Sequence, residues 1–287
     1  MNLKVIPYKL YVFTSANTSD SKVLGALSDA LHRLRSKEEL CATQAFFEAN
    51  ANRVERVASL LADAQSREAY RSLIQYRCHR ERRYINPHMQ PKRSSYLDKA
   101  LIVPGPSEVF IDIGAFQGMS SLLFQEACLA AGQPAPQCVL FEPDPFNFTR
   151  LQKNLSKFIQ EPLRFQMGLG RERGQVHFRP GAFSMSKIEP SGQGVIEVDT
   201  LEHVLAGMPE LPPVTYIKID VEGADLDVLY GARETIRKYR PRIAISIYHS
   251  NAHMIEIPEA LHEICPEYRF YVRHYSCLDG ETVLYCV

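Results

Sequence analysis

Acidic side chains stand at the ends of three apolar, strand-like stretches of the sequence, where they could bind a ligand. The first stretch is V-F-I-D-I-G-A-F-Q-G (109–118), in which Asp112 is followed by Gly114 and Gly118. Glycines there permit close approach of the backbone, and the amides that begin the next helix can face an anionic group. The spacing is not the G-x-G-x-x-G of dinucleotide folds. It predicts either a tight turn or a turn that admits a ligand.

Two further stretches place carboxylates at the ends of strands. The run C-V-L-F-E ends on Glu142, which Pro143 follows, and an apolar strand delivers Asp220, with Glu222 two residues later. A carboxylate at a strand end can accept hydrogen bonds from both hydroxyls of a ribose. Because ligands bind at the carboxyl ends of the strands in an open α/β sheet, we expect Gly114, Glu142 and Asp220 at one edge.

Two more carboxylates, Asp225 and Asp227, fall in the first turn of the helix predicted after Asp220. Negative side chains at that position interact favourably with the positive end of the helix dipole. We therefore interpret Asp225 and Asp227 as helix-stabilising residues, in contrast to Asp220.

The elements that must position these residues alternate between strand and helix from residue 109 onward. Strands are predicted over 109–113, 138–142, 163–168, 214–220, 242–249, 268–275 and 282–287, helices over 118–131, 145–159, 224–238 and 257–265, and a β-rich insert over 175–198. This alternation predicts a mostly parallel sheet covered on both faces. Only about six residues join the last two strands, too few for a parallel crossover, so the final strand should be antiparallel.

The N-terminal part of the chain has a different pattern. Apolar residues recur at helical spacing from residue 20 to about 85, with a weak break at Asn50 and Asn52, and K-L-Y-V-F (9–13) could form one strand. Prolines then punctuate a linker-like stretch that ends near Pro104. We expect a mainly helical N-terminal region over 1–104 and an α/β domain over 105–287.

Composition limits the classes of partner. Lys plus Arg and Asp plus Glu both number 33 among 287 residues, so no global field favours nucleic acid or an anionic membrane. The seven cysteines are scattered and never spaced C-x-x-C, which is typical of free thiols in a reducing compartment. Pro7 and Lys9 interrupt the first apolar run, which predicts no signal peptide, and no run approaches the ~20 apolar residues of a membrane span. These features predict a cytoplasmic protein without stable membrane insertion.

The motifs together resemble the FkbM-type S-adenosylmethionine-dependent methyltransferases, over roughly residues 94–287. Four stretches carry this resemblance: V-F-I-D-I-G-A-F-Q-G (109–118), F-E-P-D (141–144), I-K-I-D-V-E-G-A-D-L-D-V-L-Y-G-A (217–232) and P-R-I-A-I-S-I-Y-H (241–249). The resemblance implies a class I, Rossmann-like seven-stranded sheet with an antiparallel last strand. It also implies that the cofactor is S-adenosyl-L-methionine and that the reaction is methyl transfer to oxygen.

The resemblance implies roles for individual residues in cofactor binding. Asp112, Gly114, Ala115 and Gly118 would surround the methionine end of the cofactor, with Asp112 near its amino group. The ribose would be held by Glu142, with Pro143 beside it. The adenine would lie beside Met167 and Gly168, and Asp220 would sit near the sulfonium. The sequence departs from the family pattern at two positions. Gln117 stands where an acid or Asn is common, which bears on contacts to the methionine end, and Glu202 stands where Asp is usual, which bears on the insert.

We also expect residues of the N-terminal region and of the last strands at the edge of the sheet that binds the ligand. The segment S-S-Y-L-D (94–98) precedes the first strand, so Tyr96 should reach the cofactor or the acceptor, and the N-terminal helices should cover one opening. The strands over 242–249 and 268–275 should bring Tyr248, His249, His274 and Tyr275 to the methyl donor.

Methyl transfer to oxygen requires a group that accepts the hydroxyl proton. A base with a pKa near neutrality is favoured, which points first to His249 at the predicted end of a strand. His274 and Glu222 are the alternatives. Asp220 and Glu222 alone offer few ligands for a metal ion, so we predict that no metal is bound.

Three classes of function remain open. The first is an O-methyltransferase that acts on a hydroxyl of a sugar, a glycan precursor or a small metabolite. The second is an NAD-dependent sugar oxidoreductase, which lacks its glycine pattern and Tyr/Lys pair here, and the third is a non-catalytic cofactor-binding module. The basic run R-C-H-R-E-R-R (77–83), with Lys92 and Arg93, is either a solvated helix face or a grip for a phosphorylated substrate.

Overall fold

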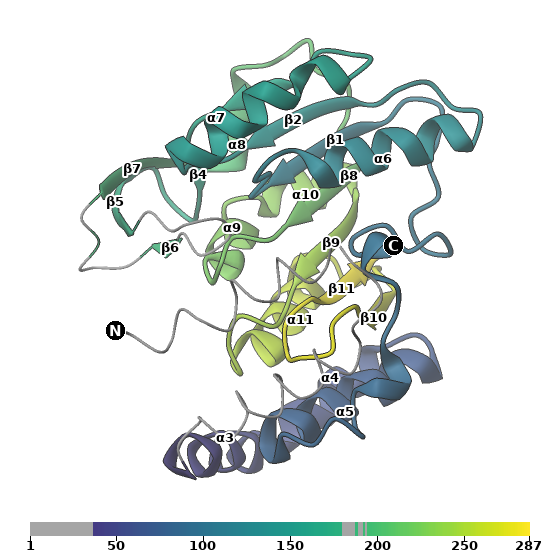
Figure 1. Cartoon of the computed structure of the whole chain (residues 1–287), viewed down its shortest axis with the longest axis vertical. Helices are drawn as coiled ribbons and strands as arrows, with labels where there is room; N and C mark the ends of the chain where they lie inside the picture. The colour runs from purple at the N-terminus through teal and green to yellow at the C-terminus, as the bar shows by residue number, and fades with distance from the viewer. Residues whose placement is uncertain (1–36, 180–186, 189–191, 193) are drawn as a thin grey trace.

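A seven-stranded sheet forms the centre of the computed structural model, which describes residues 37–179, 187–188, 192 and 194–287 (Figure 1). In spatial order its strands are β10 (Phe270–His274), β11 (Thr282–Cys286), β9 (Arg242–Ser246), β8 (Tyr216–Ile219), β1 (Val109–Ile113), β2 (Gln137–Phe141) and β3 (Leu163–Phe165). All neighbouring pairs are parallel except those of β11, which runs antiparallel to both β10 and β9. The predicted class I methyltransferase sheet with its antiparallel last strand is confirmed.

The register of the central strands brings the predicted site residues to one edge. Ile113 of β1 is paired with Phe141 of β2 on one side and with Ile219 of β8 on the other. The next residue on each of these strands is Gly114, Glu142 or Asp220. The three therefore leave the carboxyl edge of the sheet at the same level, as the sequence predicts.

Helices cover the sheet on both faces, as expected from the alternating pattern (Figure 1). They are α6 (Met119–Ala130), α7 (Pro145–Asn154), η4 (Leu155–Lys157), α8 (Leu201–Ala206), α9 (Asp225–Tyr230), α10 (Arg233–Tyr239) and α11 (His253–Ile264). The helix predicted over 224–238 is thus two helices, separated at Gly231. A Cβ atom on Gly231 would lie 1.9 Å from the carbonyl oxygen of Gly170, so a glycine is needed where the chain between the two helices contacts the segment that contains Gly170.

Two predicted elements near the site have different bounds in the structure. The strand predicted over 242–249 ends at Ser246, so His249 lies in the loop after β9. The helix predicted from residue 257 begins at His253 and contains Pro258 in its interior. Both differences matter for the site, because they place His249 in the short connection between β9 and α11, and His253 at the start of that helix.

The insert forms a second, four-stranded sheet beside the carboxyl edge of the first. Its order is β4 (Gly168–Leu169), β7 (Gly194–Asp199), β5 (Gly174–Arg179) and β6 (Lys187–Ile188). The strand predicted over 163–168 is divided between the two sheets, with β3 in the first and β4 in the second. The chain therefore crosses from one sheet to the other at Met167.

The N-terminal helices are α3 (Lys37–Ala49), α4 (Ala51–Leu60) and α5 (Ala64–His79), with the predicted break at Asn50. Apolar side chains of these helices, such as Val57 and Leu73, belong to the same hydrophobic core as Val272 and Leu284 of the sheet. The boundary at residue 104 stays a prediction. The strand predicted over 9–13 and the first part of the predicted helical stretch lie outside the described residues.

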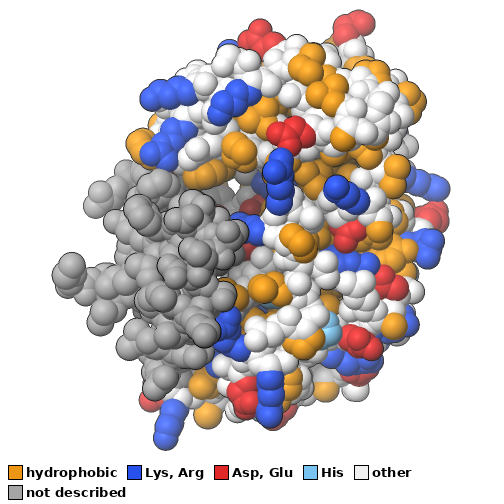
Figure 2. All heavy atoms as spheres, turned by 45° about the vertical axis from the view of Figure 1, so that its right-hand side comes forward, with side chains coloured by type: hydrophobic (Ala, Val, Ile, Leu, Met, Phe, Trp, Pro, Cys, Tyr) orange, Lys and Arg blue, Asp and Glu red, His pale blue; other side chains and the backbone are white. Residues whose placement is uncertain are grey.

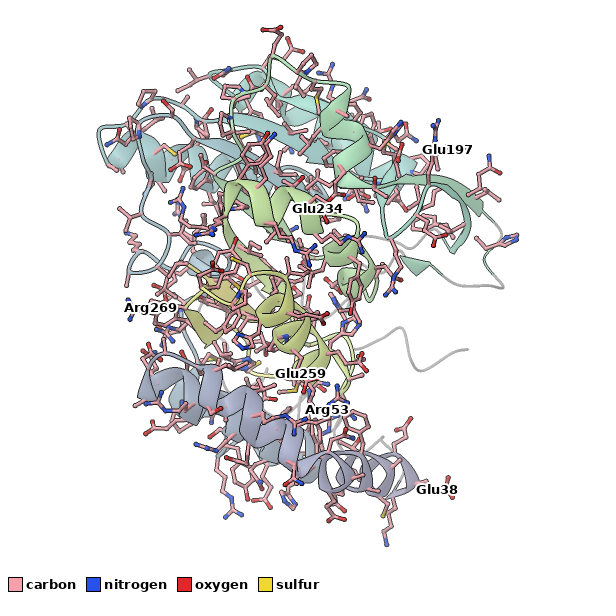
Figure 3. All side chains as sticks on the ribbon, turned by 180° about the vertical axis from the view of Figure 1, so that it is seen from behind. Glu38, Arg53, Glu197, Glu234, Glu259 and Arg269 are labelled. Carbon is pink, nitrogen blue, oxygen red and sulfur yellow. The ribbon has the colours of Figure 1, made fainter. Side chains whose placement is uncertain are left out.

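Polar contacts fix the N-terminal helices to the rest of the protein. Figure 3 shows Arg53 of α4 beside Glu259 of α11, with an Arg53 Nη2–Glu259 Oε2 distance of 2.5 Å. At the end of α5, Arg77 donates hydrogen bonds to Asn251 Oδ1 (2.9 Å) and to the Tyr248 carbonyl. Because the loop after β9 lies at the carboxyl edge of the sheet, the end of α5 approaches the edge that carries the predicted site.

Charges of both signs are interspersed on the face drawn in Figure 2, in agreement with the equal numbers of basic and acidic residues. Within the part of the chain that the structure describes, no helix is long and apolar enough to cross a membrane.

Candidate active site

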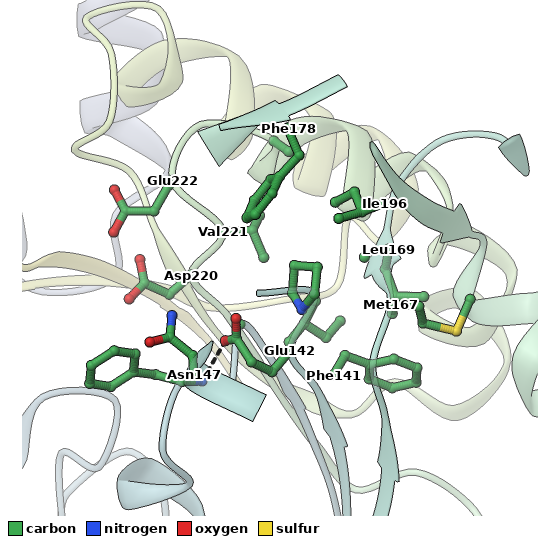
Figure 4. Close-up of a pocket in the computed structure, with 16 residues that line it drawn as sticks. Phe141, Glu142, Asn147, Met167, Leu169, Phe178, Ile196, Asp220, Val221 and Glu222 are labelled. Atoms are coloured by element: carbon green, nitrogen blue, oxygen red, sulfur yellow. Dashed lines mark hydrogen bonds between the residues drawn. The ribbon is translucent and has the colours of Figure 1, made fainter. Parts of the chain in front are cut away.

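A pocket lies at the carboxyl edge of β1, β2 and β8, against the second sheet (Figure 4). Most of the residues predicted from the ends of the strands of the first sheet line it. They are Gly114, Glu142, Pro143, Met167, Gly168, Asp220 and Glu222. Asp220 and Glu222 lie on one side of the pocket, and Met167, Leu169 and Ile196 lie on the other.

Gly114 is required by the protein's own backbone. Its φ is +79°, and a Cβ atom there would lie 1.9 Å from the carbonyl oxygen of Asp220. Gly118, with φ at +80°, has Leu151 Cδ1 at 2.7 Å from the position of its missing Cβ. The turn after β1 is therefore tight because β8 and α7 press on it, and Gly114 also lines the pocket. Ala115 is buried behind this turn, where its amide donates to the Phe141 carbonyl (2.9 Å).

Asp112 supports this turn from inside the core. Its Oδ2 accepts hydrogen bonds from the hydroxyls of Ser120 (2.5 Å) and Ser121 (2.6 Å), and its Oδ1 lies 3.2 Å from Lys218 Nζ. The Lys218 ammonium also donates to the Gly114 carbonyl at 2.6 Å. Asp112 is fully buried and lies outside the lining of the pocket.

Lys218 was not among the sequence candidates, although a lysine within an apolar strand is a usable signal. Burial lowers the pKa of Lys218, but Asp112 and Asp220 together raise it above the ordinary value. The ammonium therefore stays charged and neutralises the buried Asp112 carboxylate.

Glu142 is held by two backbone amides. Its Oε2 accepts from Phe116 N (2.8 Å) and its Oε1 from Asp144 N (3.0 Å), and only 5% of the residue is exposed. Burial raises the pKa of Glu142 to about 7, although these amides act in the opposite direction. Each carboxylate oxygen has a second lone pair, so both oxygens can still accept a hydroxyl from the pocket.

Asp220 is surrounded by donors. Its Oδ1 accepts from the hydroxyls of Ser246 (2.9 Å) and Tyr248 (3.3 Å) and lies 3.4 Å from His249 Nε2. Burial would raise the pKa of Asp220, but Lys218 and His249 hold it below the ordinary value. This carboxylate is therefore a fixed negative charge at the end of β8.

Glu222 lies beside Asp220 on the same turn. Its backbone has a φ of +53°, and its Oε2 is 3.6 Å from His249 Nε2. Burial, together with the neighbouring Asp220 charge, raises the pKa of Glu222 to about 8. Glu222 is therefore largely protonated at neutral pH.

His249 joins the loop after β9 to this acidic turn. Its Nδ1 lies 2.7 Å from Asp225 Oδ2, and its side chain is 7% exposed. Burial lowers the pKa of His249, but Asp225, Asp220 and Glu222 outweigh that effect and raise it to about 9. Asp225, Asp220, Glu222 and His249 thus form one charged cluster, of which Asp220 and Glu222 line the pocket.

Tyr96 is linked to Asp220 through the Ser246 hydroxyl and also interacts with Asp220 itself. Its hydroxyl shares a hydrogen bond with Ser246 Oγ (2.9 Å), which in turn donates to Asp220. Tyr96 is buried, with a φ of +63°, and its ring has Lys218 Nζ 5.4 Å from the centroid. Ser246 was missed at the sequence level because a serine inside an apolar strand carries no distinct signal.

The structure does not bring His274 and Tyr275 to the pocket, in contrast to the sequence-based expectation. His274 is fully buried with its Nδ1 3.0 Å from Thr282 Oγ1, and burial lowers its pKa to about 4. The Tyr275 and Tyr285 hydroxyls lie 2.6 Å apart. The reason is topological, because β11 separates β10 from β9 and moves the end of β10 away from β8.

The lining of the pocket also includes residues that sequence reasoning missed. They are Phe116, Asn147, Leu169, Phe178 and Ile196. Phe178 and Ile196 belong to β5 and β7 of the insert, whose position over the first sheet has no local signature in the sequence. The insert therefore supplies one wall of the pocket.

Two further expectations concern charged ligands. Cations near the basic run have acidic partners: Arg80 with Asp279 (2.6 Å), Lys92 with Glu281 (3.4 Å) and Arg93 with Glu126 (2.8 Å). One group of residues in the described part, Asp225, His249 and His253, offers possible metal ligands within 4.8 Å of one another. The absence of a metal stays a prediction.

Comparison with known proteins places this geometry in a family. A sequence model described as "Methyltransferase FkbM domain" matches residues 112–272, which is more than half of the chain. A solved structure of a methyltransferase FkbM from Methylobacillus flagellatus has the same fold, with a TM-score of 0.73 and 23% identity over 85% of this chain and 60% of that one.

Three curated relatives are methyltransferases by name. "Methyltransferase 1" of Beauveria bassiana is 27% identical over 47% of this chain and 64% of its own length. The hexuronic acid methyltransferase AglP of Haloferax volcanii is 28% identical over 34% of this chain and 41% of its own length. The 2-O-methyltransferase NoeI of Sinorhizobium fredii is 24% identical, over 62% and 79% respectively.

The chain thus spans less than two thirds of the length of the first two relatives and of the solved structure. The matched region nevertheless contains the end of β1 and all of β2, β8 and β9, with the pocket at their carboxyl edge. On this match, the chain belongs to the FkbM methyltransferase family.

Proposed function

We propose that this protein is an S-adenosylmethionine-dependent O-methyltransferase that acts on a hydroxyl of a sugar, a glycan precursor or a small metabolite. The observation that carries the proposal is the in-register placement of Glu142 and Asp220 in one pocket, with an imidazole beside Asp220. The names of two relatives support the proposal, because the hexuronic acid methyltransferase is named for a sugar acid and the 2-O-methyltransferase for methylation of oxygen.

The pocket suits S-adenosylmethionine because its two sides differ in polarity. Met167, Leu169 and Ile196 would hold the adenine by apolar contact, and the free lone pairs of Glu142 would accept the ribose hydroxyls. Asp220 would face the positive sulfur. Asp112 and the turn that contains Gly114, Ala115 and Gly118 would support the methionine end. The buried, incompletely used carboxylate of Glu142 is the feature that best fits a bound ribose.

When bound, the cofactor supplies a methyl group activated by the positive charge on its sulfur. The residues of this chain would orient an acceptor hydroxyl in line with that methyl and remove its proton. His249 Nε2, which faces Asp220 and Glu222, is the proposed proton acceptor, and Glu222 is the alternative. A positive charge bound beside Asp220 would lower the pKa of His249 and so favour its neutral, basic form.

We also propose a cytoplasmic location, without nucleic acid or stable membrane insertion. All seven cysteines are free thiols, and most of them are buried, which suits a reducing compartment. Charges of opposite sign are balanced over the chain, which favours a small, polar acceptor over a polyanion.

Calorimetry with S-adenosylmethionine, S-adenosylhomocysteine and NAD⁺ tests the cofactor. We expect binding of the first two and none of NAD⁺. Methyl transfer from labelled S-adenosylmethionine to a panel of neutral sugars, hexuronic acids and small alcohols then tests the reaction. Binding of NAD⁺ in preference would support the oxidoreductase, and binding of S-adenosylmethionine without transfer to any acceptor would favour a non-catalytic module.

A further inference from the structure

Two aspartates in the same helical turn have different surroundings. Asp225 and Asp227 both lie in the first turn of α9, where helix electrostatics treats them alike. The Asp227 side chain is 57% exposed and contacts Arg171 Nε at 3.1 Å on the surface. Asp225 is completely buried and faces His249. A role in helix stabilisation therefore does not account for Asp225.

The Asp225 carboxylate holds two loops at once. Its Oδ1 accepts from Val221 N and its Oδ2 from Gly223 N, both at 3.2 Å, so it fixes the turn that carries Glu222. The same Oδ2 lies 2.7 Å from His249 Nδ1 in the loop after β9. One buried carboxylate therefore sets the position of the turn after β8 relative to the imidazole.

The second nitrogen of the His249 ring points toward the acidic turn. Nε2 lies 3.4 Å from Asp220 Oδ1 and 3.6 Å from Glu222 Oε2, and it is buried without a hydrogen-bond partner among the described residues. When Nδ1 keeps its hydrogen to donate to a carboxylate, Nε2 is the acceptor nitrogen of the neutral ring. The tautomer that Asp225 selects is the one that a base at Nε2 needs.

We propose that Asp225 is a positioning residue, which fixes the tautomer and orientation of His249 and aligns it with the turn that carries Glu222. This inference rests on the proposed function. In the step that it serves, the acceptor oxygen bonds to the methyl carbon and its proton passes to Nε2. The carbon–sulfur bond breaks, and its electron pair stays on sulfur as a neutral thioether. The Nδ1 hydrogen remains with His249 throughout.

Other charged and titratable groups face His249, and the test must separate them from Asp225. Asp220 and Glu222 approach from the turn after β8, and the Tyr248 ring lies 4.2 Å from the imidazole, centroid to centroid. His253 Nδ1, from α11, is 3.7 Å from Asp225 Oδ2, and Arg77 from α5 binds the Tyr248 carbonyl. Asp225, His249 and His253 are also the group that could hold a metal ion, and the metal is the rival to the positioning role.

Nuclear magnetic resonance of the full chain with isotope-labelled histidine tests the proposal without an acceptor. A His249→Asn variant identifies the signal of His249 among the nine histidines. In the wild-type protein above the pKa of His249, we expect hydrogen on Nδ1 and a bare Nε2. The opposite tautomer would overturn the proposal, and this result does not depend on whether any variant folds.

A matched pair of variants extends this test. Removal of the negative charge in Asp225→Asn should lower the pKa of His249 by about one to two units, because an opposite charge at this distance favours the charged ring. Asp227→Asn should leave it unchanged. If both variants shift the pKa of His249 equally, or if neither does, the positioning role is wrong.

A titration with zinc distinguishes the positioning role of Asp225 from a metal site formed by Asp225, His249 and His253. Titration of the wild-type protein with Zn²⁺ should produce no stoichiometric shift of the His249 and His253 signals, whereas a shift that His253→Asn abolishes would assign the cluster to a metal. Failure of the proposed function is separate, because absence of methyl transfer by the wild-type protein would leave the tautomer and the pKa of His249 as measured.

Discussion

At the β1–β2 end of the pocket, Glu142 is held by backbone amides, whereas at the β8–β9 end Asp220 and Glu222 are surrounded by side chains from the end of β9 and the loop after it. The first end presents a carboxylate in a frame of main-chain hydrogen bonds. The second end groups three carboxyl groups around His249, namely Asp220, Asp225 and the largely protonated Glu222. We therefore infer that the end proposed to hold the cofactor is preformed, and that the proposed chemistry depends on proton positions at the other end.

The largest effect is expected at the β8–β9 end. His249→Asn should slow the chemical step by about 10²–10⁴-fold, because it removes the proposed proton acceptor, and should leave affinity for S-adenosylhomocysteine nearly intact. Single-turnover kinetics and calorimetry measure the two quantities. His262→Asn, at the exposed end of α11, is the control. An unchanged chemical step would transfer the role to Glu222.

A substitution at the β1–β2 end should instead weaken binding of the cofactor. In the proposed cofactor site, Glu142→Ala would leave the ribose hydroxyls without acceptors and should weaken S-adenosylhomocysteine binding by about 2–4 kcal/mol, which is roughly 30- to 1,000-fold. Glu161→Ala, at an exposed position before β3, should have no effect. Because Glu142 also accepts two amides, thermal unfolding must confirm that the variant is folded. Unaltered affinity in a folded variant would remove Glu142 from the ribose.

The pH dependence of methyl transfer should be set by groups at the β8–β9 end. The pKa values of Glu222 and His249 are raised to about 8 and about 9, so both groups hold a proton at neutral pH and either must lose it to act as a base. The rate of methyl transfer should therefore rise with pH, by up to about tenfold per unit, until these groups are deprotonated. His249→Asn should change this limb. A rate that falls as pH increases above 7 would contradict the assignment of the base.

The smallest effect is expected for Tyr96. Tyr96→Phe removes a hydroxyl that interacts with Asp220 and with the Ser246 hydroxyl that donates to it, while Ser246 and Tyr248 remain as donors to Asp220. The cost to transfer should therefore be about 1 kcal/mol or a few-fold in rate. Affinity for S-adenosylhomocysteine should not change. Tyr84→Phe, which removes a hydroxyl on the surface, is the comparison. A loss as large as that of His249→Asn would mean that Tyr96 itself contacts the acceptor.

The same contrast explains what the sequence could predict. Gly114, Glu142 and Asp220 were predicted together because each follows an apolar strand, and parallel strands in register end at one level. Contacts that depend on order in space were not predictable. His274 ends a strand as expected, but β11 separates that strand from β9.

The role of Asp225 could not be predicted from the sequence for the same reason. Its position in a first helical turn has an adequate local explanation, and only the loop after β9, more than twenty residues later, gives it a second role. Phe178 and Ile196 likewise become pocket residues only when the insert folds over the first sheet.

A crystal structure with S-adenosylhomocysteine tests the central claim most directly, namely that the cofactor spans the two ends of this pocket. The account predicts adenine against Met167, Leu169 and Ile196, the ribose hydroxyls on Glu142, and the sulfur next to Asp220 with His249 Nε2 on the acceptor side. A ligand bound elsewhere, or bound with its ribose away from Glu142, would contradict it.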